Sequence, residues 1–170
     1  MSEALQNHTT ARCACGSVEL EAIGAPIMSV VCYCESCQAG SRQIEALPNG
    51  GPVRGPDGGT AYALYRKDRV EYLKGSPLLR DYKLTDESST KRVVATCCDS
   101  PMFLNFEKGH WLSVYRTALR GELPPLEMRV HTKSKPEGSD LPNDVPSYPG
   151  YSAKFMVKLF AAWVAMLLRR

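Results

Sequence analysis

Short stretches in which apolar and polar residues alternate dominate the first 130 positions of the chain. The clearest is SVELEAI at 17–23, where Val18, Leu20 and Ala22 alternate with two glutamates, the period-two pattern of a half-buried strand. Similar stretches, rich in β-branched or aromatic residues, predict strands at 26–31, 61–65, 69–73, 78–84, 92–96, 102–106, 110–116 and 126–130. No strong amphipathic helix separates them, so we expect a mainly β domain without parallel βαβ units.

The pattern changes after residue 130. Residues 131–150 are rich in proline, as residues 48–60 are in glycine and proline, and both segments are expected to be irregular. Residues 151–170 predict an amphipathic helix with Ser152 as its N-cap, Lys154 and Lys158 on one side and large apolar residues on the other. We therefore expect a flexible N-terminus at 1–10, a β domain at 11–150 and a C-terminal helix at 151–170.

The role of the C-terminal helix stays open at this point. Its unbroken apolar run, 159–168, is far shorter than the ~20 residues that span a bilayer. Residues 152–170 are expected either to pack on the domain or on a second copy in a homodimer, or to make a peripheral membrane contact, with basic residues on the polar side.

Composition and charge limit the kinds of partner and the cellular compartment that can be expected. With 170 residues and 44% hydrophobic residues, the chain can bury a core without covalent help. A net charge of +3, with basic residues scattered among acidic ones, argues against a nucleic-acid partner. The first fifteen residues show no apolar run after a basic region, as a signal peptide would, so we expect a cytoplasmic protein with reduced thiols.

Cysteines are the most informative residues of the chain. The seven cysteines form three short clusters, which are Cys13 and Cys15, then Cys32, Cys34 and Cys37, then Cys97 and Cys98. Free cysteine is often simply a small buried hydrophobe, but scattered hydrophobes rarely cluster in this way. Close spacing is what a metal ion needs, because several thiolates must converge on it. The clusters therefore predict metal binding.

The order and spacing of these clusters resemble a known family. The segments CACG (13–16), CYCESCQAG (32–40), CCDSPMF (97–103), HTKSKP (131–136) and VPSYP (145–149) are similar to those of the glutathione-dependent formaldehyde-activating enzymes and the related centromere protein V domains. The resemblance covers roughly residues 10–150. It implies a complex all-β zinc-binding fold of the β-tent type, to which this chain adds the C-terminal α-helix, with up to two zinc ions per chain.

The resemblance also divides the cysteines between two sites. Cys13, Cys15 and Cys98 match a closed structural zinc site, whose fourth cysteine would stand where this chain has Ala95. Adjacent residues rarely reach one ion together. The site could therefore be rebuilt with Cys97, completed by another ligand, or lost, and we favour the site rebuilt with Cys97. Asp99 replaces the usual glycine there.

The second site is open. Cys32, Cys34 and Cys37 match a three-cysteine zinc site that keeps one coordination position free for substrate, so these cysteines are the expected catalytic group. Tyr33 stands where the family usually has histidine, and tyrosine is a poor base at neutral pH. No further cofactor-binding residue can be assigned.

Two functions follow as hypotheses. The first, which we favour, is an enzyme, a zinc-dependent carbon–sulfur lyase that acts on a thiol–aldehyde adduct, as an S-hydroxymethylglutathione synthase acts on glutathione and formaldehyde. Its small thiol substrate, such as glutathione, would meet Arg42 or Arg54 through its carboxylates, although both are more often solvated loop residues. The alternative is a non-catalytic zinc-stabilised module that self-associates or binds a membrane surface through its C-terminal helix.

Overall fold

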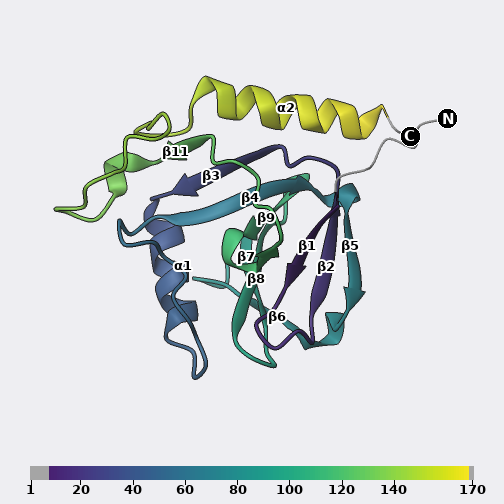
Figure 1. Cartoon of the computed structure of the whole chain (residues 1–170). Coiled ribbons are helices and arrows are strands. Elements are labelled where there is room, and N and C mark those ends of the chain that lie inside the picture. The colour runs from purple at the N-terminus through teal and green to yellow at the C-terminus, as the bar shows by residue number, and fades with distance from the viewer. Residues whose placement is uncertain (1–7, 169–170) are drawn as a thin grey trace.

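The structure, a computed structural model, describes residues 8–168 and consists of two β-sheets and two α-helices (Figure 1). The strands are β1 (His8–Arg12), β2 (Glu19–Ile23), β3 (Met28–Cys32), β4 (Thr60–Arg66), β5 (Val70–Lys74), β6 (Leu79–Tyr82), β7 (Thr90–Ala95), β8 (Ser100–Phe106), β9 (Trp111–Tyr115), β10 (Leu119–Arg120) and β11 (Met128–Val130). The helices are α1 (Glu35–Glu45) and α2 (Ala153–Leu167). The expected mainly β fold with a C-terminal helix is confirmed.

The two sheets differ in size and share no strand. The smaller sheet has the order β10-β1-β2-β5, and the larger has the order β11-β3-β4-β9-β8-β7-β6. All strand pairs are antiparallel except β11 with β3, where Met128, Arg129 and Val130 lie opposite Val30, Val31 and Cys32. This parallel pairing brings the segment after β11 beside the cysteines that follow β3.

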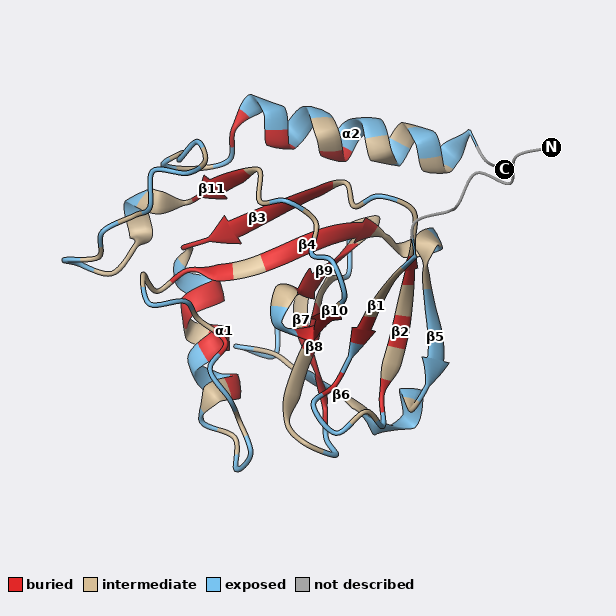
Figure 2. Cartoon of the chain, in the orientation of Figure 1, coloured by how far each residue is buried: buried red, intermediate tan, exposed pale blue. Residues whose placement is uncertain are grey.

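Two groups of buried side chains form the core. One joins the sheets through residues such as Leu20, Phe103 and Val114. The other lies on the opposite face of the larger sheet and includes Met28 and Met128, together with Phe155 of α2. Figure 2 shows the buried residues concentrated in β3, β4 and β11 under α2. The second core group therefore depends on α2 as a cover.

Helix α2 begins as the sequence predicts. The Ser152 hydroxyl accepts a hydrogen bond from the backbone N–H of Phe155 and caps the helix. Phe155 and Leu159, one turn apart, are its buried residues and face the sheet. Lys154 and Lys158 both pair with Glu127. Along the described residues, no helix is long and apolar enough to cross a membrane.

Two elements correct the sequence analysis. The expectation that no helix separates the strands is wrong, because α1 follows β3. Its buried face consists of small or polar residues, Cys37, Gln38, Gly40 and Ser41, with Ile44 as the one large apolar residue. A pattern built on large hydrophobic residues does not detect such a face. Residues 8–10, placed in a flexible N-terminus, pair with β2 as part of β1, while residues 1–7 lie outside the described part of the chain.

Candidate metal centres and the adjoining cavity

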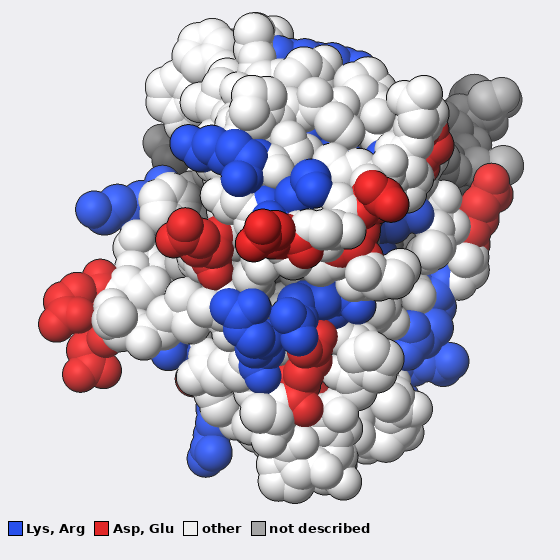
Figure 3. Space-filling view, turned by 90° about the vertical axis from the view of Figure 1, so that its left-hand side faces the viewer, with Lys and Arg blue, Asp and Glu red and all other residues white. Residues whose placement is uncertain are grey.

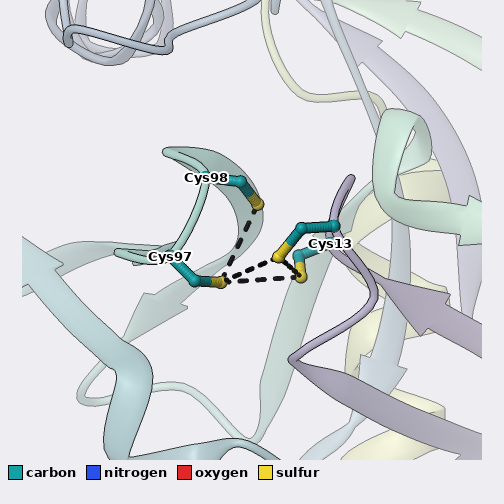
Figure 4. A group of neighbouring side chains, drawn as sticks. Cys13, Cys97 and Cys98 are labelled. Carbon is teal, nitrogen blue, oxygen red and sulfur yellow. Dashed lines mark hydrogen bonds between the residues drawn. The ribbon is translucent and has the colours of Figure 1, made fainter.

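Four cysteines from two distant parts of the chain meet between the two sheets. Cys13 and Cys15 follow β1, and Cys97 and Cys98 form the turn between β7 and β8 (Figure 4). We call them the four-cysteine cluster. Their sulfur atoms lie within 4.8 Å of one another, with Sγ–Sγ distances of 3.6 Å for Cys13–Cys15, 3.3 Å for Cys15–Cys97 and 3.8 Å for Cys97–Cys98. Sulfur atoms at the corners of a tetrahedral zinc site are about 3.8 Å apart, so the cluster fits zinc.

The conformation of the β7–β8 turn explains how the adjacent Cys97 and Cys98 both contribute to the four-cysteine cluster. The Cys98 N–H donates to the Ala95 carbonyl, which closes a tight turn after β7. Asp99 then adopts a positive φ of 53°, a conformation that favours glycine. Its carboxylate accepts hydrogen bonds from the backbone and side-chain N–H groups of Asn49, which offset the strain. Ala95 itself is fully buried in the core, and Cys97 lies in the cluster as expected.

The other three cysteines lie where β3 ends and α1 begins. Cys32 ends β3, Cys34 caps α1 and Cys37 lies in its first turn, and their sulfur atoms also lie within 4.8 Å of one another. We call them the three-cysteine cluster. The Cys34 sulfur accepts the Cys37 backbone N–H at 3.3 Å. The partial positive charge of the helix N-terminus favours thiolates here.

Hydrogen bonds within this cluster distribute its protons unequally. The thiols of Cys32 and Cys37 donate to Cys34 and lower the pKa of Cys34 to about 2. The contact with Cys34 correspondingly raises the pKa of Cys32. The Tyr62 hydroxyl donates to the Cys37 sulfur at 3.6 Å. Zinc would bind all three residues as thiolates, and its binding would release the protons that Cys32 and Cys37 keep here.

A buried arginine lies next to the three-cysteine cluster. Arg92 of β7 has no exposed surface, and its Nη2 donates to the carbonyl and hydroxyl oxygens of Ser36, the residue before Cys37. Its Nε and Nη1 have no hydrogen-bond partner among the described residues. Three thiolates around one Zn²⁺ would carry a net charge of −1, which a buried cation bonded to the neighbouring Ser36 would partly offset. Nothing in the sequence pattern indicated this role.

A cavity of about 430 Å³ adjoins the three-cysteine cluster. Strands β3, β4, β7, β8, β9 and β11 and helices α1 and α2 supply its walls. Its lining residues are Val30, Cys32, Cys34, Ser36, Cys37, Tyr62, Leu64, Thr90, Leu104, Phe106, Trp111, Ser113, Val130, Tyr151, Phe155, Met156 and Leu159. Cys32, Cys34 and Cys37 therefore all face this cavity, which is large enough to admit a fourth metal ligand.

Other residues considered from the sequence lie apart from the cavity. The buried Tyr33 hydroxyl donates to Asp57 at 2.6 Å and accepts from Arg129 Nε at 3.2 Å, and burial raises its pKa. Tyr33 therefore anchors the 48–60 loop and does not act as a base. Arg54 pairs with Glu45 at 2.6 Å, and Arg42 is exposed; neither lines the cavity.

Comparison with known proteins confirms part of the resemblance. The sequence profile of the family described as glutathione-dependent formaldehyde-activating enzyme matches residues 8–47. This segment holds five of the cysteines, Cys13, Cys15, Cys32, Cys34 and Cys37. The match does not extend to Cys97 and Cys98 or to the segments after residue 130, where the resemblance rests on the motifs alone.

The remaining comparisons give less information about function. No curated protein matches the chain. A crystal structure of a Rhodobacter sphaeroides protein aligns with a TM-score of 0.49 at 17% sequence identity, and the alignment covers 81% of this chain and 98% of the other. The family match and the two cysteine clusters are therefore the findings that bear on function.

Proposed function

We propose that this chain is a zinc-dependent carbon–sulfur lyase that joins a small thiol to an aldehyde and cleaves the resulting adduct. The observation that carries the proposal is that Cys32, Cys34 and Cys37 all line one cavity. Three thiolate ligands leave one position of a tetrahedral zinc site free. Zinc bound there would supply the positive charge that favours the thiolate form of an incoming thiol. The family description, which names glutathione and formaldehyde, supports this class of reaction.

The residues around the cluster suit both directions of that reaction. In the addition, the thiol sulfur bonds to the aldehyde carbon, the carbonyl π bond breaks, and the thiol proton ends on the new hydroxyl oxygen. Ser36 lines the cavity, and its hydroxyl accepts from Arg92, which leaves its own hydrogen free to donate to the carbonyl oxygen. The aliphatic and aromatic walls exclude water, which strengthens these polar contacts.

The test is the rate at which ¹³C-labelled formaldehyde exchanges between its free form and its thiol adduct, followed by NMR. The protein is expected to accelerate exchange, and Cys34→Ser is expected to abolish the acceleration while zinc falls from two ions to one per chain. Cys97→Ser is the matched control, because it removes a thiol from the other cluster and should leave exchange intact. Exchange that is no faster than in buffer, or that survives Cys34→Ser, would contradict the proposal.

A second property, self-association through α2, is supported by a separate observation. The outer side of the helix exposes Val157, Phe160 and Trp163, with exposed fractions of 66%, 63% and 42%. Figure 3 shows that the top of the molecule, where α2 lies, is mostly uncharged. The two lysines on the other side of the helix are held by Glu127, so they are poorly placed to bind anionic lipid. We therefore propose that this face packs against a second copy of the chain.

Sedimentation velocity tests this second proposal. The chain is expected to sediment as a dimer at micromolar concentration, and Phe160→Glu to sediment as a monomer, while Ala161→Glu, on the lysine side of the helix, keeps the dimer. A monomeric wild type that co-sediments with anionic vesicles would show instead that the face binds lipid.

A further inference from the structure

Among the described residues, no lysine, arginine, histidine, aspartate or glutamate lines the cavity beside the three-cysteine cluster. Its walls are mainly aliphatic and aromatic, with Leu64 and Leu104 on the strands, Trp111 at the start of β9, and Phe155 and Met156 on α2. The polar groups are hydroxyls and the cysteine sulfurs themselves. A volume of about 430 Å³ lies within the range of pockets that hold small organic ligands.

Several basic residues around the cavity are already engaged or enclosed. His131 packs edge-on against Tyr151, and Lys67 donates to the carbonyl of Phe106, two residues that line the cavity. Arg92 has no exposed surface and binds Ser36. Lys158 pairs with Glu127, and Arg54 pairs with Glu45. An anionic thiol such as glutathione would bring two carboxylates to this space. Without a cationic partner, moving such groups out of water is costly.

We propose that the thiol accepted by the three-cysteine cluster carries an apolar group, aromatic or aliphatic, which occupies this cavity against α2. This inference rests on the proposed function, since it takes the sulfur of that thiol to be the fourth ligand of the metal. It replaces the charged tripeptide expected from the family description with a hydrophobic substrate. Helix α2 is then a specificity element, because Phe155, Met156 and Leu159 form one wall of the cavity.

Cobalt-substituted protein provides the test, because binding of a thiol to Co²⁺ changes its visible absorption. Phenylmethanethiol and glutathione are titrated separately at one pH and ionic strength. Phenylmethanethiol is expected to bind with a dissociation constant at least about tenfold lower, since its ring leaves water for an apolar site. The same comparison on Cys34→Ser confirms that the absorption change comes from the three-cysteine cluster.

Substitutions on α2 test where the apolar group of the bound thiol lies. Met156 lines the cavity yet is 53% exposed, so Met156→Glu should fold and weaken phenylmethanethiol binding about tenfold. Ala161→Glu is the matched control. Ala161 is exposed on α2 and does not line the cavity, and its substitution is expected to keep the dimer, so it should leave thiol affinity unchanged. Met156→Lys should favour glutathione over phenylmethanethiol relative to wild type.

The outcomes separate the two proposals. If glutathione binds as tightly as phenylmethanethiol or tighter, the inference is overturned while the lyase proposal stands. If Ala161→Glu weakens binding as much as Met156→Glu does, the cavity is not the binding site and the inference is overturned. If no thiol changes the cobalt spectrum at millimolar concentration, the proposed function itself fails and takes the inference with it.

Discussion

Tyr33 lies between two cysteines of the three-cysteine cluster, yet its hydroxyl bonds away from them. Because it joins Asp57 and Arg129, Tyr33→Phe leaves two buried or half-buried partners with one hydrogen bond fewer. We expect this variant to lose about 1–2 kcal/mol of unfolding free energy in urea denaturation and to keep its thiol affinity within about twofold. A large loss of thiol affinity at unchanged metal content would show that Tyr33 belongs to the site.

Gly40 marks the closest approach of α1 to the buried arginine. A Cβ atom added there would lie 1.6 Å from Arg92 Nε, so Gly40→Ala must displace the guanidinium or the helix. Although alanine favours helix by about 1 kcal/mol, we expect a net destabilisation of about 1–3 kcal/mol from overpacking. Urea denaturation measures it.

Gly51→Ala is the control for this prediction. No atom lies within 4 Å of its added Cβ, and alanine there should be neutral or slightly stabilising. Equal stability of the two variants would mean that α1 and Arg92 are not in close contact.

At the scale of elements, the four-cysteine cluster connects the smaller sheet to the larger one. Cys13 and Cys15 follow β1, whereas Cys97 lies in the β7–β8 turn. Removing one ligand by Cys97→Ser should weaken metal binding at this cluster, since three thiolates hold an ion less tightly than four, and should loosen the contact between the sheets. We expect faster amide hydrogen exchange in β1 and β2 and little change in β3 and β4.

The neighbouring Thr96→Ala provides the comparison, because Thr96 is exposed and lies outside the cluster. It should leave the metal content and the exchange rates of β1 and β2 as they are. If the two variants exchange alike, the cluster does not link the sheets.

The elements also show what the sequence reveals about this fold. Strand β2 and helix α2 follow from periodicity, because β2 alternates buried Leu20 and Ala22 with glutamates, and α2 buries Phe155 and Leu159 one turn apart. Strand β1 was missed because, in HTTAR, Ala11 is its one buried residue. Helix α1 was missed because small and polar residues form its buried side. Periodicity detects an element through its large hydrophobic residues. The buried faces of β1 and α1 consist mainly of small or polar residues instead.

The candidate site, too, could be predicted from the sequence only in part. The three-cysteine cluster follows from short spacing, because its three residues are neighbours in sequence. The four-cysteine cluster does not, since Cys15 and Cys97 are 82 positions apart and only the family resemblance connected them. The cavity could not be predicted in this way, since its walls come from six strands and both helices, and its character depends on which side chains meet. Arg92 lies 55 residues beyond Cys37 in the chain, and no local pattern connects the two.

For the whole molecule, the central claim is that one chain holds two metal sites of different kinds, one closed and one open to a thiol. Cadmium-substituted protein measured by ¹¹³Cd NMR tests this most directly, because the resonance reports the ligands of each ion. We predict two resonances at about equal intensity, of which one shifts when phenylmethanethiol is added and the other stays fixed. A single resonance, or two that do not respond to millimolar thiol, would contradict the claim.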